Sequence, residues 1–587
     1  MKTKFYLILM LLIPMLSMQA VTTTFYVNPA AAGANDANNG TTPQTAWVSL
    51  NPTKWVDGCV VMLSPGVHAV LSTANVTANV TLQGTSKSEV IIEGLSDDDI
   101  ARGSESPQFF QVNGAITLTL KDISLRNFVS TVDLWGGMFN VSATSTLVLE
   151  NVNISNAKLP LRGGAAISSN GTLNLKNVSF ENCASSIGAV ISIQGLGVAT
   201  IDNATFKNNT TVDGTNGYKF GGAIHVNTAT ANVTINNSYF NSNICSNIAE
   251  NPGLNYPVGG AIAFRVGSAY NVKLHVTNSV FSKNYATWSG GAIMIDKMGT
   301  FDPVSNIDLY LANNTFFENS VPKMHGQVFS VGGGHEANLT GSLSFVNNTF
   351  MHNGPAVPTD EFSSLFFNST ATTFNWINNV LQDKVWNASL GKFFGWGFVL
   401  NNGGTNYFNS LTFKGSVFDS FGGWLLGATY DQIAGADNAI GSNAVDSVLT
   451  IPTTGQPYLA ISNANSIAIN KGVDEFTFNG KNIVAATDAR GIAKFGASKD
   501  AGAYEYVPVS ALKNTKKPTM FAYPNPFKDV ILLTNDVASI SIYDLAGKKR
   551  FTASNVNKIN VAYLEAGLYV VNVVNIDGTV LTQKMQK

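Results

Sequence analysis

The stretch GGAIHVNTATANVTINNSYFNSNIC, residues 221–245, decides the fold because variants of it recur along much of the chain. It holds two kernels, GGAIHV and NSYF, and the second has the form Asn-x-x-apolar. Related second kernels begin at Asp122, Asn151, Asn177, Asn203, Asn237, Asn278, Asn313, Asn347, Asn378 and Gly415. Their spacing ranges from 26 residues (Asn151 to Asn177) to 41 residues (Asn237 to Asn278). A constant kernel at unequal spacing predicts stacked structural units joined by loops of variable length.

The glycine-rich kernel also recurs, as GGAAIS, GAVIS, GGAIAF and GGAIMI from Gly163, Gly188, Gly259 and Gly290. Each unit therefore contains at least two short alternating segments, separated by turn residues and by no helical pattern. Such strands can pair in parallel with their counterparts one coil later, at a spacing of ~4.8 Å. This arrangement is a parallel β-helix.

Two side-chain columns are expected inside and at the corners of this coil. Asparagine tolerates left-handed backbone geometry, so the kernel asparagines are predicted at corners, where their amides pair between coils as a ladder. The phenylalanines of successive kernels are predicted to form an internal stack. They are Phe180, Phe206, Phe240, Phe281, Phe316 and Phe350.

The GGAI kernels, together with FENC, FKNN, FNSN, FSKN, FFEN and FMHN, resemble the repeats of polymorphic outer membrane proteins and related pectate-lyase-like β-helices. The resemblance covers roughly residues 110–360 and implies an all-β fold, a right-handed parallel β-helix. The closing asparagine lies two residues after the phenylalanine at Asn182 and Asn208, and three after it at Asn284, Asn319 and Asn353, with Asn243 also available. The resemblance says little about activity, because the same coil serves lyases, hydrolases and adhesins.

The remaining segments indicate an exported protein with capped ends. Lys2 and Lys4 precede an apolar run that ends near Ala20, which predicts a secretory signal peptide. Asp488, Arg490, Asp500 and Glu505 are interpreted as turn and cap residues, with a metal site as the alternative. The predicted divisions are signal peptide 1–20, N-terminal cap 21–60, β-helix 61–430, C-terminal coils and cap 431–506, linker 507–518 and a C-terminal module 519–587.

The C-terminal module is expected to contain about seven short strands in a small immunoglobulin-like β-sandwich. YPNP (Tyr523, Pro524, Asn525, Pro526), LEAGLYVVNV (with Gly567 and Tyr569) and DGTVLTQKMQK (with Gly578 and Lys584) are similar to the type A sorting domain of the type IX secretion system. The resemblance implies export to the periplasm, recognition by the type IX machinery, and then release or attachment to the cell surface. An immunoglobulin-like module that binds carbohydrate is the alternative.

Composition excludes several classes of partner. Charged residues make up 12% of the chain and the net charge is -2, which gives no electrostatic basis for nucleic-acid binding. After the N-terminal run, no segment approaches the ~20 apolar residues of a membrane span, and a monomer is expected. Cys59, Cys183 and Cys245 are predicted to be buried thiols, with a Cys183–Cys245 disulfide as the alternative.

One candidate ligand patch emerges on the predicted coils. Aligning the glycine kernels places Ile224 inward and His225 outward and exposed. Two positions after His225, an outward column is predicted that contains Ser169, Ile193, Asn227, Arg265 and Asp296. Arg265 and Asp296 would lie on adjacent coils and hold an anionic or hydroxyl-rich ligand. A surface ion pair, worth about 0–1 kcal/mol, is the alternative.

No catalytic residue, metal site or cofactor is predicted, since acidic residues are sparse along the coils. Aromatic residues at 393–398, followed by Trp424, are interpreted as core or as a platform for sugar rings. The sequence therefore predicts a non-enzymatic adhesin or glycan-binding scaffold. The alternative is a polysaccharide lyase, for which calcium would be required, or a glycoside hydrolase acting on acidic polysaccharide.

Overall fold

The computed structural model describes most of the chain beyond the predicted signal peptide 1–20. The described residues are 22–70, 73–95, 109–130, 135–212, 219–246, 256–266, 270–297, 305–322, 326–332, 337–354, 363–367, 369–370, 372–383, 385–387, 392–394, 396–400, 408–419, 437–441, 444–453, 455–508, 522–545, 547–575 and 580–587. The signal peptide, most of the predicted linker, Trp424, Gly578 and the side chains of 393–398 lie outside this description.

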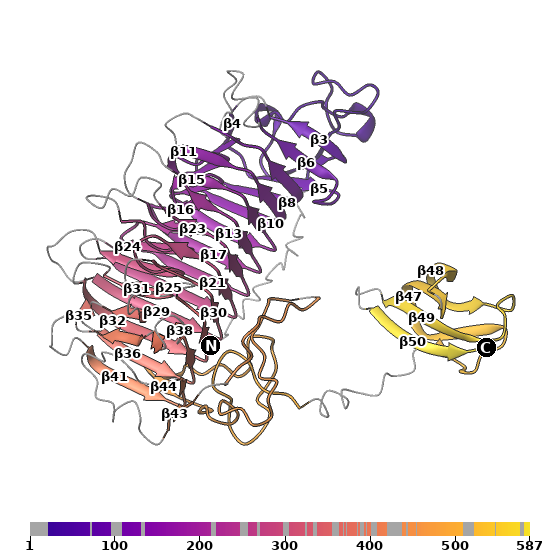
Figure 1. Ribbon diagram of the computed structural model, residues 1–587. Helices are drawn as coiled ribbons and strands as arrows, with labels where there is room; N and C mark the ends of the chain where they lie inside the picture. Colours follow the sequence, from indigo (N-terminus) through magenta and orange to yellow (C-terminus); the bar gives the residue numbers. More distant parts are fainter. Residues whose placement is uncertain are drawn as a thin grey trace, which may run out of the picture. The chain divides into compact units, whose positions relative to one another are not determined.

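The chain divides into two compact units, residues 1–506 and 507–587. Apart from two 3₁₀ turns, η1 (Pro43–Thr45) and η2 (Pro52–Lys54), the described residues form strands, turns and loops. The first unit is a stack of coils in which each strand pairs in parallel with its counterpart on the next coil (Figure 1). The predicted parallel β-helix is confirmed.

The largest sheet of the β-helix, here called the long sheet, has two arms that meet at a corner. The strands of its first arm are β1 (Thr24–Val27), β2 (Cys59–Leu63), β5 (Val80–Gly84), β8 (Thr117–Arg126), β10 (Thr146–Ser155), β13 (Thr172–Lys176), β17 (Val198–Asp202), β21 (Asn232–Asn236), β25 (Asn271–Thr277), β29 (Ser305–Ala312), β32 (Ala337–Val346), β36 (Thr372–Ile377) and β41 (Phe408–Lys414). Strands β8 and β10 run through the corner into the second arm. The other strands of the second arm are β3 (Gly66–Ala69), β6 (Val90–Glu93), β14 (Ser179–Glu181), β18 (Thr205–Lys207), β22 (Tyr239–Asn241), β26 (Val280–Ser282), β30 (Thr315–Phe317), β33 (Thr349–Met351), β37 (Val380–Gln382), β42 (Val417–Phe418) and β43 (Ala439–Ile440). Strand β35 (Ser369–Thr370) pairs with the start of β32.

Two further parallel sheets complete the coils. The 11-stranded sheet contains β4 (Ala74–Val76), β7 (Phe110–Val112), β9 (Phe139–Val141), β12 (Ile167–Ser169), β16 (Ile191–Ile193), β20 (Ile224–Val226), β24 (Ile262–Val266), β28 (Ile293–Lys297), β31 (Phe329–Val331), β34 (Ser363–Phe367) and β40 (Trp396–Leu400). The 5-stranded sheet contains β11 (Lys158–Gly163), β15 (Ala184–Ile187), β19 (Thr210–Thr211), β23 (Ile244–Cys245) and β27 (Tyr285–Ala286). Two antiparallel pairs lie outside the coils, β38 (Val385–Asn387) with β39 (Lys392–Phe394) and β44 (Thr477–Phe478) with β45 (Lys481–Asn482).

The corner of the long sheet lies where the kernels predicted it. The first residue of all ten kernels has a positive φ, between 47° at Asn237 and 64° at Gly415. The amides of several of these asparagines bond between coils, as in the bond from Asn203 Nδ2 to Asn177 Oδ1 (2.8 Å). The glycine kernels satisfy a different constraint, since a Cβ added to Gly222 would lie 2.1 Å from the carbonyl oxygen of Gly260. Both kernels therefore recur for backbone reasons.

The core of the β-helix contains the predicted phenylalanine stack. Rings from Phe180 to Phe350 follow one another with centroids 4.7–5.0 Å apart, and interplanar angles stay at or below 16°. The three cysteines are free and buried, so the Cys183–Cys245 disulfide alternative is wrong and the buried-thiol prediction is confirmed. Burial raises the pKa of the Cys183 and Cys245 thiols to about 12.

A second asparagine ladder, buried inside the coil, corrects the sequence-based spacing. Its asparagines all lie three residues after the stacked phenylalanine, and they are Asn209, Asn243, Asn284, Asn319 and Asn353. Asp383 ends the ladder and lies two residues after Leu381, the register partner of Phe350. Asn182 and Asn208, two residues after the phenylalanine, instead adopt positive φ at a second corner. Cys183 occupies the ladder position of its coil and donates its backbone N–H to Asn209 Oδ1 (2.9 Å).

The segment after β43 runs back along the outside of the long sheet. Gln456 Nε2 donates to the carbonyl of Asn237 (2.8 Å), and Tyr310 donates its hydroxyl to the carbonyl of Ile483 (2.7 Å). Val484 and its neighbours pack against an apolar cluster on the outer side of β29, β32 and β36. The C-terminal segment of the first unit thus covers one part of the long sheet and leaves another part open.

The second unit is an antiparallel sheet with its own core. Its strands are β46 (Ala522–Tyr523), β47 (Val530–Asp544), β48 (Lys549–Asn560), β49 (Leu568–Asn575) and β50 (Val580–Gln586). The described residues form five strands where the sequence predicted about seven. Strand β47 continues through Asn535 and Asp536, residues typical of a turn, and its pairing with β48 shifts register there instead of ending.

Candidate functional site

The predicted exposed histidine, His225, is buried. Its side chain points outward from the coil, as its register partners Ser192 and Ala263 do, but only 3% of it is exposed. The ring of Phe220 stacks on it, with centroids 5.3 Å apart. Burial, with a smaller contribution from the Arg265 charge, lowers the pKa of His225 to about 3. The prediction is wrong because a residue from the preceding segment covers this face.

The remaining patch residues are placed only in part as predicted. Arg265 and Asp296 are register partners on adjacent strands, so their adjacency is confirmed. The Arg265 guanidinium lies 4.5 Å from the centroid of the Phe220 ring. Ile193 pairs with Val226, not with Asn227, and both Ile193 and its partner Ser169 are fully buried. The predicted outward column was therefore shifted by one residue on the earlier coils.

A second group of polar side chains, which the sequence analysis missed, lies on the outer side of the long sheet beside the returning C-terminal segment, whose Ile483 carbonyl accepts the Tyr310 hydroxyl. Strands β25 and β29 pair so that Asn271, Lys273 and His275 lie directly beside Asn306, Asp308 and Tyr310. We call these six residues the β25–β29 patch. Asn306 Nδ2 donates to Asn271 Oδ1 (2.9 Å), which leaves amide groups of both residues at the surface. Counting back from kernel residues Asn278 and Asn313 gives this register, so the signal was present in the sequence.

The centre of the β25–β29 patch is a histidine–carboxylate pair. His275 Nε2 lies 3.1 Å from Asp308 Oδ2, with 27% and 52% of the two side chains exposed. The hydrogen bond from His275, reinforced by the charges of His275 and Lys273, lowers the pKa of Asp308. The ring of Tyr310 lies 5.5 Å from the imidazole, measured between centroids. The patch therefore presents an ammonium, an imidazole, a carboxylate and two amides beside an aromatic ring.

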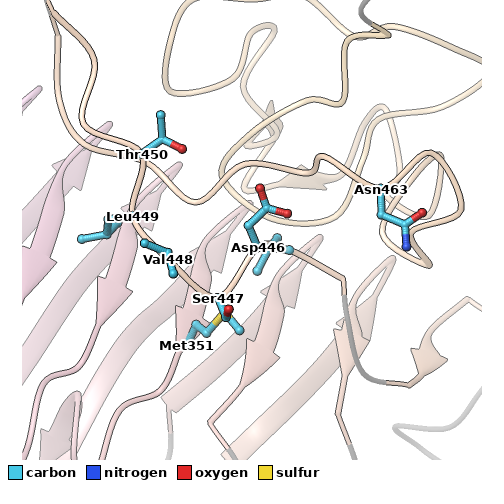
Figure 2. Close-up of a pocket in the computed structure, with 8 residues that line it drawn as sticks. Met351, Asp446, Ser447, Val448, Leu449, Thr450 and Asn463 are labelled. Carbon is cyan, nitrogen blue, oxygen red and sulfur yellow. The ribbon is translucent and has the colours of Figure 1, made fainter.

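A cavity of ≈ 510 Å³ lies near the last coils, between β33 and the returning C-terminal segment (Figure 2). Asp446, Ser447, Thr450 and Asn463 give it polar groups, while its apolar lining comes from Met351, Val445, Val448 and Leu449. Ser462 donates its hydroxyl to Asp446 Oδ1 (2.6 Å) and fixes that carboxylate. The cavity has the size of a small-ligand site but contains no aromatic ring among its lining residues.

The acidic residues near the end of the first unit hold its last turns together. Asp488 pairs with Arg490 (2.6 Å) and accepts the backbone N–H of Glu505 (3.1 Å). Asp500 accepts backbone N–H groups from Asn470 and Tyr506. Burial and the Asp500 charge raise the pKa of Glu505 to about 7. Within the described ranges, no group of three or more His, Cys, Asp or Glu side chains is placed to hold a metal ion.

The residues that suggested the sorting domain lie at the margins of its sheet. Tyr523 is 40% exposed, while Tyr569 is buried and donates its hydroxyl to the carbonyl of Glu565 (2.8 Å). Gly567 pairs through its backbone with Lys587. Pro524, Pro526 and Lys584 are exposed, and the described residues include no helix able to span a membrane.

The two units define a parallel β-helix followed by a small antiparallel module. Residues 522–587 match the family model described as "Secretion system C-terminal sorting domain". The C-terminal segment is thus a type IX secretion sorting domain, which sends the protein out of the cell or to its surface. No curated protein sequence matches the chain.

Two solved structures are similar in part to this chain. Pectate lyase Pel9A is 14% identical with a TM-score of 0.32, over 82% of this chain and 96% of that one. A mutant of the PL6-family alginate lyase AlyGC is 10% identical with a TM-score of 0.31, over 75% of this chain and 58% of that one. The assignment of the fold rests on the strand pairing of this chain.

Proposed function

We propose that the β-helix is a non-enzymatic scaffold, secreted or displayed at the cell surface, that binds glycan chains on the outer face of its long sheet. The β25–β29 patch carries the proposal. Its donors and acceptors from two strands lie side by side next to the Tyr310 ring, and sugars are recognised through such hydroxyl partners and ring faces. The ammonium of the half-buried Lys273 favours a glycan that carries carboxylate groups.

Binding of the full chain to a panel of neutral and uronate-containing polysaccharides tests this function. K273A and H275A are expected to weaken binding of the acidic members about tenfold each, because a charged or polar partner is removed without disturbing the core. K176A is the matched control, since Lys176 is exposed on β13 of the same sheet, away from the patch. Equal binding by K273A, H275A and K176A would contradict the assignment of the patch.

Arg265 and Asp296, with Asn227 alongside, remain a proposed second contact surface on the 11-stranded sheet. R265A in the same panel tests this surface. A loss of binding confined to R265A would move the site from the long sheet to the 11-stranded sheet.

A polysaccharide lyase is the second candidate function, and the His275–Asp308 pair favours it. A carboxylate that orients an imidazole prepares it to accept a proton, and Lys273 beside it would neutralise a substrate carboxylate. Incubation of the full chain with uronate polysaccharides, with and without calcium, tests this candidate. Absorbance from unsaturated products would replace the non-enzymatic proposal with a lyase, and its absence would retain the scaffold.

A further inference from the structure

The YPNP motif of the sorting domain contacts the last strand of the chain through Asn525. Asn525 Nδ2 donates to the carbonyl of Lys584 (3.2 Å), and its Oδ1 accepts the backbone N–H of Gln586 (2.8 Å). The backbone N–H of Phe527 donates to the carbonyl of Gln586 (2.8 Å). One side-chain amide thus occupies the positions that a neighbouring strand would fill.

The opposite side of the same residues is paired with β49. Lys584, Met585 and Gln586 lie beside Val570, Tyr569 and Leu568. Residues 584–586 of β50 are therefore held on both sides, by a strand on one side and by the motif on the other. An edge strand without such a partner presents unpaired N–H and C=O groups and frays readily at its end.

The chemistry of this contact requires an amide. The side chain donates to a carbonyl and accepts from an N–H at the same time, which asparagine does and aspartate does not. Aspartate at 525 would keep the bond from Gln586 but would place a carboxylate against the carbonyl of Lys584. Gln583 makes a similar double contact with the backbone of Ala522, the residue that precedes the motif (3.2 and 2.8 Å).

We infer that Asn525 is a positioning residue for secretion, which holds residues 584–586 in the form that the sorting machinery recognises. Pre-ordering a recognised segment lowers the entropy cost of binding, so a frayed strand is a poorer sorting signal even in a folded protein. This inference concerns export alone and is independent of the glycan-binding proposal.

The test measures export and local order of the full chain in a bacterium with a type IX secretion system. N525A is expected to speed amide exchange of residues 584–586 about tenfold or more, because two hydrogen bonds are lost. The exported fraction is expected to fall at least about fivefold, with protein retained in the periplasm, while exchange in the β-helix is unchanged. N525D, which keeps one of the two bonds, is expected to give an intermediate effect on both measurements.

N560D is the matched control. Asn560 is also exposed, and its Oδ1 accepts the backbone N–H of Ala562 (3.0 Å), a bond that aspartate keeps. Normal export of N525A, or reduced export with unchanged exchange at 584–586, overturns the inference. If N525A unfolds the module, N525D is judged by the same two criteria, and N560D must be exported normally.

Discussion

The corner ladder and the buried ladder that begins at Asn209 both run along the β-helix, and they differ in what each position requires. The corner ladder carries a positive φ at every kernel, yet it accepts Asp122 and Gly415 in place of asparagine. The buried ladder is asparagine on five successive coils, from Asn209 to Asn353. At the corner the constraint is backbone geometry, and on the earlier coils, where these side chains are not buried, water can satisfy them. Inside the coil each amide must satisfy several polar groups without water.

The largest effect is expected from breaking the buried ladder in its middle. Asn284 Nδ2 donates to Asn319 Oδ1 (2.9 Å) and to the carbonyl of Phe240 (3.0 Å). Its Oδ1 accepts the backbone and side-chain N–H groups of Asn243. N284A leaves these buried groups without partners and is expected to cost about 4 kcal/mol of unfolding free energy. Denaturant unfolding of the full chain measures this loss. A loss smaller than that of the corner variant N237A would contradict the stricter requirement of the buried ladder.

The end of the buried ladder is occupied by an acid. Asp383 Oδ1 accepts the backbone N–H and Nδ2 of Asn353 (2.9 and 2.8 Å). Burial, with the Asp419 charge on the next coil, raises the pKa of Asp383 to about 7. The folded state therefore holds its proton more tightly than the unfolded state, whose pKa is ordinary. The stability contributed by the protonated form is complete below about pH 4 and is lost as the pH rises to 7.

D383N is expected to remove this pH dependence and to continue the ladder by one amide. The variant should match the parent near pH 4 and exceed its unfolding free energy by roughly 4 kcal/mol at pH 8, since one pKa unit corresponds to ~1.4 kcal/mol. Thermal unfolding midpoints across pH 4–8 check this. A difference between the two proteins that does not grow with pH would show that Asp383 is not protonated in the folded state.

His225 is a buried polar residue outside these two ladders, and its substitution gives a further test. Neither ring nitrogen has a hydrogen-bond partner among the described residues, and the pKa of about 3 means that the folded state excludes the proton. Stability is therefore lost as the pH falls below 6.5. H225M, which matches Met294 in the same column, is expected to gain about 3 kcal/mol at pH 5 and about 1 kcal/mol at pH 7. Unfolding at the two pH values measures it, and an equal gain at both would contradict the assignment.

What the sequence predicts well is what every coil repeats. The kernel corners and the phenylalanine stack are each required on successive coils, so the same sequence signal recurs on every coil. The burial of His225 was missed because its cover, Phe220, lies at a position that the next coils fill with Val258 and Ser289, so no constant residue marks it. The β25–β29 patch was missed because Lys273, His275 and Asp308 belong to two coils joined by a loop of irregular length, and only the kernel count aligns them.

The smallest effect is expected at the corner ladder, where backbone geometry can be separated from the amide. Asn237 has φ 47°, and its Nδ2 lies 3.4 Å from Asn203 Oδ1 at the surface, so the side-chain bond contributes little. N237A places an alanine in left-handed backbone geometry and is expected to lower the unfolding free energy by about 1 kcal/mol. N237G adopts the same geometry without steric cost and should change the unfolding free energy by less than about 0.5 kcal/mol. Denaturant unfolding of N237A, N237G and N284A under the same conditions compares their unfolding free energies. If N237G costs as much as N237A, the amide and not the backbone fixes the corner, and the two ladders then obey one rule.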